Sequence, residues 1–162
     1  ESFVSADVVI IVDVSGSMAD KDSRGGRSRY DVALEELAQL QASLPGKIAV
    51  LAFSTDTVFV PSGQPPMLCA STNLAGALRF AKPADLPGMR FVVISDGAPD
   101  SEQMALDVAR TYAARIDTVF VGRETDQHAR DFLRRLAEAS GGQARTAAQV
   151  RELAAVTLKL LE

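Results

Sequence analysis

Residues Asp7 to Ser17 read Asp-Val-Val-Ile-Ile-Val-Asp-Val-Ser-Gly-Ser, a β-branched run that ends in polar residues. The unbroken run from Val8 to Val12 is typical of a strand buried on both faces, as in a parallel sheet. Oxygen-bearing side chains follow at once, in Asp13, Ser15 and Ser17. Open α/β sheets bind their ligands beyond the carboxyl ends of the strands. This stretch therefore predicts a fold class and the place of a site.

The rest of the chain alternates between helix and strand patterns. Apolar residues recur at three- and four-residue steps from Tyr30 to Leu44, which indicates a helix with one buried stripe. Residues 47–53 form a second apolar run, and Thr57 to Val60 is expected to pair with it as an antiparallel strand at the sheet edge. The other expected elements are helices at residues 73–81, 101–114, 127–139 and 148–161, and strands at residues 90–94, 117–121 and 143–146.

This alternation predicts the fold class. Strands separated by helix-length segments pair in parallel through right-handed crossovers. We expect a doubly wound α/β domain of the Rossmann-like kind: a mostly parallel central sheet, one antiparallel edge strand and helices on both faces. The 162 residues, 47% of them hydrophobic, suit a single domain with one core. Because the chain begins at Glu1 without an initiator Met, we expect residues 1–162 to have been taken from a longer protein.

Composition argues against several classes of protein. A net charge of −4 does not fit a nucleic-acid-binding domain, which is usually basic. The longest apolar run is too short to cross a bilayer. Cys69 is the only cysteine, so no intrachain disulfide can form, which fits a reducing compartment. We expect a cytoplasmic location, unless an N-terminal signal or anchor has been removed. The excess of arginine over lysine hints at a GC-rich bacterial source.

Three polar segments follow strands or open a helix. Asp13, Ser15 and Ser17 follow the first strand, Asp96 follows the strand at residues 90–94, and Thr72 stands before the helix at residues 73–81. In a doubly wound sheet the first strand is central and the strand before Asp96 can lie beside it. The two carboxylates are then expected to converge, with the three hydroxyls around them.

These five oxygen ligands suit a hard divalent cation. Mg²⁺ takes about six oxygens and usually keeps some water. Two carboxylates balance its charge and three hydroxyls add none, so the ion stays electrophilic and accepts a further carboxylate from outside. Mg²⁺ is therefore the expected cofactor. Mn²⁺ fits the same ligands, and Ca²⁺ fits less well because it tends to take more of them.

The same residues carry a family resemblance. Asp-x-Ser-x-Ser after a strand, Thr-Asn-Leu at a helix start and Ser-Asp-Gly after a later strand resemble the metal-ion-dependent adhesion site (MIDAS) of von Willebrand factor type A (VWA) domains. The resemblance implies that Asp13, Ser15, Ser17, Thr72 and Asp96 coordinate the metal. It also implies a protein-binding module, not an enzyme, whose partner offers an acidic side chain. Members of that family act in adhesion, in complex assembly and, in bacteria, beside chaperone-type ATPases. The resemblance therefore implies a protein partner, with a bacterial chaperone-type ATPase or a complex subunit among the candidates, and does not choose among these roles.

Other interpretations stay open. An Asp after the first strand with a second Asp near Mg²⁺ also resembles haloacid-dehalogenase-like phosphohydrolases, but these usually need an acid/base Asp where this chain has Ser15. A third alternative is a structural domain whose metal only stiffens the loops. Asp100 or Ser101 is expected to cap the helix at residues 101–114, and capping is the favoured role of Asp100. The segment from Ala19 to Arg29 is expected to be a mobile surface loop beside the metal, with partner recognition as its second interpretation. Six of the seven phenylalanines are expected to pack in the core: Phe53, Phe59, Phe80, Phe91, Phe120 and Phe132.

Overall fold

The β-branched run forms the strand β1 (Val8–Asp13), at the centre of the sheet in the computed structural model. The structure describes residues 5–43 and 46–146. β1 pairs in parallel with β2 (Ile48–Phe53) on one side and with β4 (Arg90–Ser95) on the other. All six residues of β1 are buried, as expected for a strand covered on both faces.

The sheet has six strands in the order β3-β2-β1-β4-β5-β6. β3 (Thr57–Val60) is antiparallel to β2 at one edge. β5 (Ile116–Phe120) and β6 (Ala144–Thr146) continue the parallel sheet to the other edge. The strand order reverses beside β1, since the chain builds outward from it first on one side and then on the other. The expected doubly wound, mostly parallel sheet with one antiparallel edge strand is confirmed.

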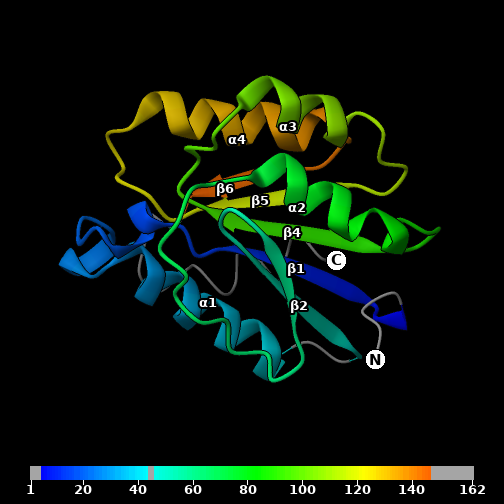
Figure 1. Ribbon diagram of the computed structural model, residues 1–162, viewed down its shortest axis with the longest axis horizontal. Coiled ribbons are helices and arrows are strands. Elements are labelled where there is room, and N and C mark those ends of the chain that lie inside the picture. The colour runs from blue at the N-terminus through cyan, green and yellow to red at the C-terminus, as the bar shows by residue number, and fades with distance from the viewer. Residues whose placement is uncertain (1–4, 44–45, 147–162) are drawn as a thin grey trace.

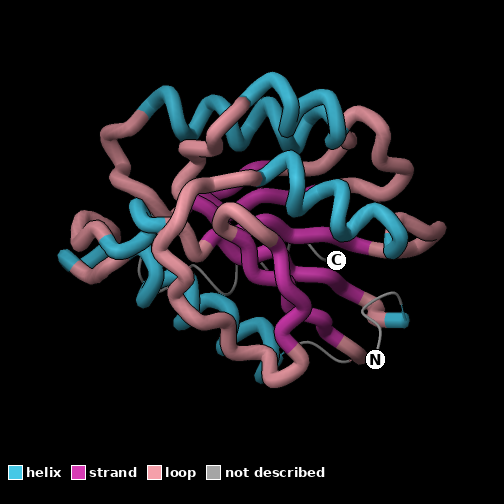
Figure 2. Tube along the Cα trace, in the orientation of Figure 1, coloured by secondary structure: helices cyan, strands magenta, loops and turns pink. Residues whose placement is uncertain are grey.

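Helices cover both faces of the sheet (Figures 1 and 2). On one face, α2 (Leu74–Ala81), α3 (Glu102–Ala109) and α4 (Gln127–Ala139) pack on the core that contains Val9 and Ile11. On the other face, α1 (Arg29–Ser43) packs on Ile10 and Val12. Alternate residues of β1 thus feed the two cores. Among the described residues, no helix has the length and apolar character needed to span a bilayer.

Most of the expected elements are present within one or two residues, and α4 has the predicted bounds. The predicted helix at residues 101–114 ends earlier, at Ala109. Residues 112–114 are not helical, because they form hydrogen bonds with groups far away in sequence. The Tyr112 hydroxyl donates to the carbonyl of Leu78 at 2.5 Å, and the next two backbone N–H groups donate to Asp85. The expected helix at residues 148–161 lies outside the described residues. Phe80 is 38% exposed, so its expected core position is wrong.

Candidate metal centre

The carboxyl ends of β1 and β4 bring the two predicted carboxylates together. Val12 lies beside Ile94 in the parallel register, so Asp13 ends β1 next to the end of β4 and Asp96 follows directly. Asp13 is fully buried and Asp96 is 2% exposed. Burial of two neighbouring carboxylates is costly unless each is hydrogen-bonded or paired with a cation.

Three hydrogen bonds hold Asp13. Its Oδ1 accepts from the backbone N–H of Ser15 at 2.9 Å and from the Ser15 hydroxyl at 2.5 Å. Its Oδ2 accepts from the hydroxyl of Ser95 at 2.8 Å, and that hydroxyl in turn accepts from the backbone N–H of Gly97 at 3.0 Å. Ser95 was not predicted as a site residue, although the register of β4 against β1 places it beside Asp13.

Asp96 is bound by a hydroxyl and by a guanidinium. Its Oδ2 accepts from the Ser17 hydroxyl at 2.5 Å and from Nη1 of Arg29 at 2.9 Å. Ser17 lies in the short 3₁₀ helix η2 (Gly16–Ala19), which is anchored in the core by the fully buried Met18. Of the predicted ligands, Asp13, Ser15, Ser17 and Asp96 therefore lie in one cluster of side chains.

The fifth predicted ligand, Thr72, is held beside this cluster by its backbone. The backbone N–H of Gly16 donates to the carbonyl of Ala70 at 3.0 Å, which places the loop before α2 against η2. Thr72 is 7% exposed. Within residues 5–43 and 46–146, its hydroxyl makes no hydrogen bond to Asp13 or Asp96. Thr72 therefore stays a predicted ligand: its backbone lies beside the cluster, but its side chain is not hydrogen-bonded to the two carboxylates.

Asp100 fixes the Thr72 loop and does not cap α3, so its predicted capping role is wrong. Its Oδ1 accepts from the backbone N–H of Thr72 at 2.9 Å, and its own N–H donates to the carbonyl of Thr72 at 2.8 Å. The helix cap is Ser101, whose side chain accepts from the N–H of Met104. Both residue types are good caps, but only one can stand at the N-cap position.

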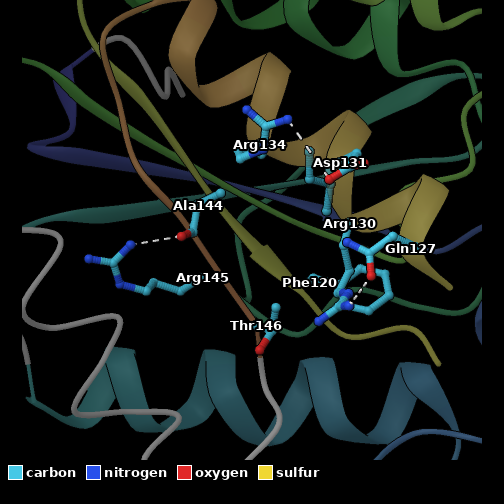
Figure 3. Close-up of a pocket in the computed structure, with 9 residues that line it drawn as sticks. Phe120, Gln127, Arg130, Asp131, Arg134, Ala144, Arg145 and Thr146 are labelled. Carbon is cyan, nitrogen blue, oxygen red and sulfur yellow. Dashed lines mark hydrogen bonds and ion pairs between the residues drawn. The ribbon is translucent and has the colours of Figure 1, made fainter. Parts of the chain in front are cut away.

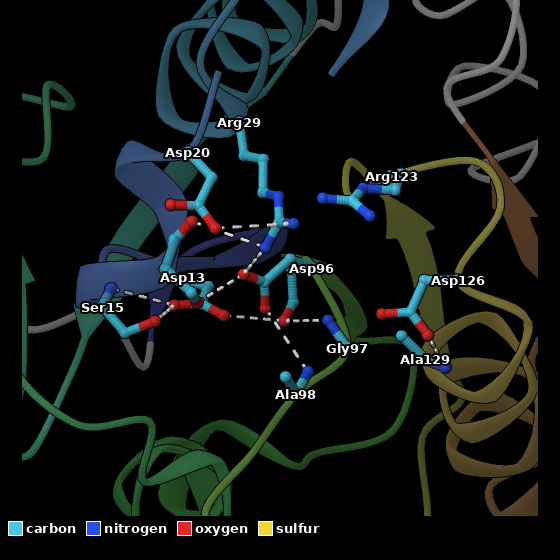
Figure 4. A network of polar contacts seen from close by, with 12 residues as sticks. Asp13, Ser15, Asp20, Arg29, Asp96, Gly97, Ala98, Arg123, Asp126 and Ala129 are labelled. Carbon is cyan, nitrogen blue, oxygen red and sulfur yellow. Dashed lines mark hydrogen bonds and ion pairs between the residues drawn. The ribbon is translucent and has the colours of Figure 1, made fainter. Parts of the chain in front are cut away.

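The segment from Ala19 to Arg29 is tied to the rest of the domain by ion pairs. Its arginines are paired within the domain: Arg24 and Arg27 form ion pairs with Glu35 of α1. Arg29 reaches the cluster itself, where its Nη1 donates to Asp96 (Figure 4). Its Nε and Nη2 donate to the two oxygens of Asp22, both at 2.7 Å. Arg29 is thus a residue of the site that the sequence did not predict.

The electrostatics of the two carboxylates differ from those of surface acids. Burial, and then the neighbouring charge of Asp96, raise the pKa of Asp13 to about 6, although the hydrogen bonds from Ser15 and Ser95 lower it in part. Hydrogen bonds from Arg29 lower the pKa of Asp22. The raised pKa of Asp13 means that burial, together with the charge of Asp96, disfavours the ionised form more than the hydrogen bonds favour it.

The donor set fits a hard divalent cation. Within the described residues there is no cluster of three or more His, Cys, Asp or Glu side chains that could hold a metal. The cluster at the end of β1 instead combines two carboxylates with serine hydroxyls. An all-oxygen set of this kind suits Mg²⁺ or Mn²⁺ and does not suit Zn²⁺, which favours nitrogen and sulfur. A cation would also offset the charge that raises the pKa of Asp13.

A cavity of about 310 Å³ lies elsewhere, between α4 and β6 (Figure 3). Phe120 and Leu133 form part of its wall, and Arg130, Arg134 and Arg145 surround it. None of the predicted site residues lines it. The arginines make it a poor site for a cation, so the cluster at the end of β1 is the better candidate for a metal.

Known proteins share this fold at low sequence identity. No protein-family model and no curated protein matches the sequence. The structure resembles that of an aerotolerance-related membrane protein from Bacteroides fragilis, with a TM-score of 0.75 and 16% identity over 95% of this chain and 97% of that one. It also resembles manganese-loaded TRAP protein from Plasmodium vivax, with a TM-score of 0.72 and 16% identity over 95% of this chain and 72% of that one. A von Willebrand factor type A structure from Catenulispora acidiphila has a TM-score of 0.65 and 18% identity over 95% and 41% of the two chains. These likenesses show that the chain has the VWA fold.

Proposed function

We propose that this VWA-fold chain is a protein-binding module that holds one divalent cation, Mg²⁺ in the first place, and binds a carboxylate of its partner there. The observation that carries the proposal is the pair of buried carboxylates, Asp13 and Asp96, hydrogen-bonded to serine hydroxyls at the carboxyl ends of the two central strands. Ligands of doubly wound sheets bind at this place, where the strand order reverses.

Five residues would hold the metal: Asp13, Ser15, Ser17, Thr72 and Asp96. A bound Mg²⁺ would supply a Lewis-acidic position for one oxygen of an incoming Asp or Glu side chain. Mn²⁺ suits the same donors, and the manganese-loaded Plasmodium vivax TRAP structure is consistent with that choice of ion. Ca²⁺ is less suitable because it favours more ligands.

The charge of the site supports an acidic ligand. The sequence predicts that two carboxylates neutralise a divalent cation. The structure adds the guanidinium of Arg29, whose side chain is 12% exposed and which contacts Asp96 directly. Asp22 and Asp20 also pair with Arg29, but their side chains are more exposed, at 21% and 60%. With the metal bound, Asp13, Asp96, Arg29 and the cation together therefore carry one net positive charge. A partner carboxylate would neutralise it, whereas a neutral or basic side chain would not.

Exposed residues around the cluster would meet the rest of the partner. Ala19 and Asp20 lie on one side of it in sequence, and Cys69, Ala70 and Ser71 lie on the loop that contacts Gly16. These positions would set specificity beyond the shared carboxylate. The partner would be a protein with an exposed acidic side chain. We propose a chaperone-type ATPase or another subunit of a complex as such a partner.

The enzyme alternative receives less support from the site. A phosphohydrolase of the haloacid-dehalogenase kind usually needs an acid/base residue two positions after Asp13. Ser15 occupies that position, is fully buried, and donates its hydroxyl hydrogen bond to Asp13. A serine hydroxyl is too weak an acid and too weak a base to act as the general acid/base near neutral pH. Hydrolysis of a generic phosphate ester that is lost in Asp13→Asn would restore the enzyme alternative.

Calorimetry with Mg²⁺ tests the proposal. The wild type should bind one Mg²⁺, and Asp13→Asn should not. Asp107→Asn is a matched control, because Asp107 is an exposed aspartate on α3 with a side chain 61% exposed. It should bind as the wild type does. No heat of binding in the wild type at millimolar Mg²⁺ would refute the metal site.

Retention of the partner separates a binding metal from a stiffening one. Once a partner is in hand, its retention on the immobilised domain should be lost in EDTA and restored by Mg²⁺. Retention that is unchanged by EDTA would favour a structural domain with a purely stabilising metal. Thermal melting alone does not decide, because any ligand of the folded state raises the melting temperature.

A further inference from the structure

We propose that Arg29 is a fixed counter-cation of the metal site that makes metal binding and carboxylate binding interdependent. Arg29 lowers the affinity for Mg²⁺ alone and raises the affinity of the metal-loaded site for an acidic partner. This inference rests on the proposed function, since it assigns to one further residue the regulation of that same site.

The position of the guanidinium is fixed from both ends. Arg29 is the first residue of α1, and its backbone N–H donates to the carbonyl of Asp20 at 3.0 Å. Its side chain forms a two-bond pair with Asp22 through Nε and Nη2. Nη1, on the other side of the guanidinium, donates to Asp96 at 2.9 Å and to the carbonyl of Ser17 at 3.4 Å. A side chain with so many bonds cannot swing away cheaply when a metal arrives.

The charges alternate along this network. The exposed Arg123 donates to Asp22 at 3.2 Å, Asp22 pairs with Arg29, and Arg29 pairs with Asp96. Asp22 lies on the far side of the guanidinium from Asp96 and is 21% exposed, and Asp20, which also pairs with Arg29, is 60% exposed. Of these charges, Arg29 is the one that contacts a predicted metal ligand directly and has the sign of the metal.

Two consequences follow from that sign. Arg29 and a divalent cation compete for the charge of Asp96, because like charges a few ångströms apart repel. Mg²⁺ alone is then bound more weakly than by a site without the arginine. Once the metal is bound, the same positive charge attracts an anion. By linkage, a carboxylate that binds more tightly in the presence of Mg²⁺ must tighten Mg²⁺ by the same factor.

The first experiment measures the affinity for Mg²⁺ by calorimetry at constant ionic strength. Arg29→Gln should bind Mg²⁺ at least about tenfold more tightly than the wild type, because charges a few ångströms apart near a protein surface change an equilibrium by more than this factor. Arg123→Gln removes the same charge from the exposed end of the network and should change the affinity less than about threefold. Equal or weaker Mg²⁺ binding by Arg29→Gln would overturn the inference.

A second variant separates charge from structure. Arg29→Lys keeps the positive charge but loses the two-bond pair with Asp22. It should bind Mg²⁺ within about threefold of the wild type, since the repulsion remains. Tightening in the lysine variant as large as that in the glutamine variant would overturn the inference, because the effect would then come from altered structure. Circular dichroism confirms that each variant is folded before titration.

The coupling itself is measured with acetate as the carboxylate probe. In the wild type, replacing sodium chloride by sodium acetate at equal ionic strength should tighten Mg²⁺ binding. In Arg29→Gln the tightening should be smaller, and equal tightening in both proteins would overturn the coupling. If wild type and variants bind no Mg²⁺, the proposed function fails together with this inference. If the wild type binds Mg²⁺ and Arg29→Gln gains nothing, only the inference fails.

Discussion

Replacing Asp13 by Asn should stabilise the metal-free domain at neutral pH while removing the metal site. The carboxylate of Asp13 is fully buried beside Asp96, and its pKa is raised from 3.8 to about 6, first by burial and then by that charge. A carboxyl group with a raised pKa in the folded state is easier to protonate there than in the unfolded chain. The charged form is therefore a source of instability.

The sign and the size of the effect follow from this shift. Well below pH 3.8 the carboxyl is neutral in both states and costs nothing. As the pH rises from there to above about 6, the unfolded chain ionises first, and the folded protein loses about 3 kcal/mol of stability at 1.36 kcal/mol per pKa unit. The asparagine of the variant is a neutral side chain of the same shape, with an oxygen for the bonds from Ser15, and should show no such loss.

Urea unfolding in EDTA, at pH 4 and at pH 7, measures the difference. The free energy of unfolding of Asp13→Asn should exceed that of the wild type by about 2 kcal/mol more at pH 7 than at pH 4, because the unfolded carboxyl is already partly ionised at pH 4. Saturating Mg²⁺ should then raise the stability of the wild type and not that of the variant. A difference between the two proteins that is equal at both pH values would refute the electrostatic description of the cluster.

Three further predictions concern stability. Asp85→Asn should lower the free energy of unfolding by about 1–3 kcal/mol in urea, because this carboxylate accepts from two backbone N–H groups and a lysine. These bonds outweigh burial and lower its pKa, so the wild type should lose that advantage as the pH falls below about 4, while the variant does not. Gly97→Ala should cost at least about 2 kcal/mol, because φ is +76° and a Cβ would lie 2.6 Å from the carbonyl oxygen of Ala129; an unchanged melting temperature would contradict this. Ser101→Ala removes the cap of α3 and should cost about 1 kcal/mol by chemical denaturation, and a neutral result would show that the cap adds little.

The fold could be predicted because its main features are local. The β-branched run of β1 and the helix-length segments between the strands together predict a parallel sheet whose strands are joined by helical crossovers. The predicted bounds of α4 match the structure, in which Asp126 caps its start and Gly141, at φ +83°, follows its end. The end of α3 was not predicted, because the hydrogen bonds of Tyr112 and Asp85 that end it come from groups about 30 residues away in sequence.

The candidate site divides in the same way. Asp13 and Asp96 could be placed together because parallel strands end at one edge of the sheet. Arg29 could not, because its partner Asp96 is 67 residues away and an arginine at a helix start has no feature that points to a metal site. Asp100 was misassigned because its neighbour Ser101 is an equally good cap, and only the contact with Thr72 decides between them.

The central claim is that a divalent cation binds among Asp13, Ser15, Ser17, Thr72 and Asp96. Anomalous diffraction from crystals of the domain grown with Mn²⁺ tests it most directly, because the signal locates the metal without reference to any function. The account predicts one strong peak beside the carboxylates of Asp13 and Asp96, with the serine hydroxyls and the Thr72 hydroxyl turned toward it, and no such peak in Asp13→Asn. No peak at this cluster in crystals grown at millimolar Mn²⁺, or a peak that persists in the variant, would contradict it.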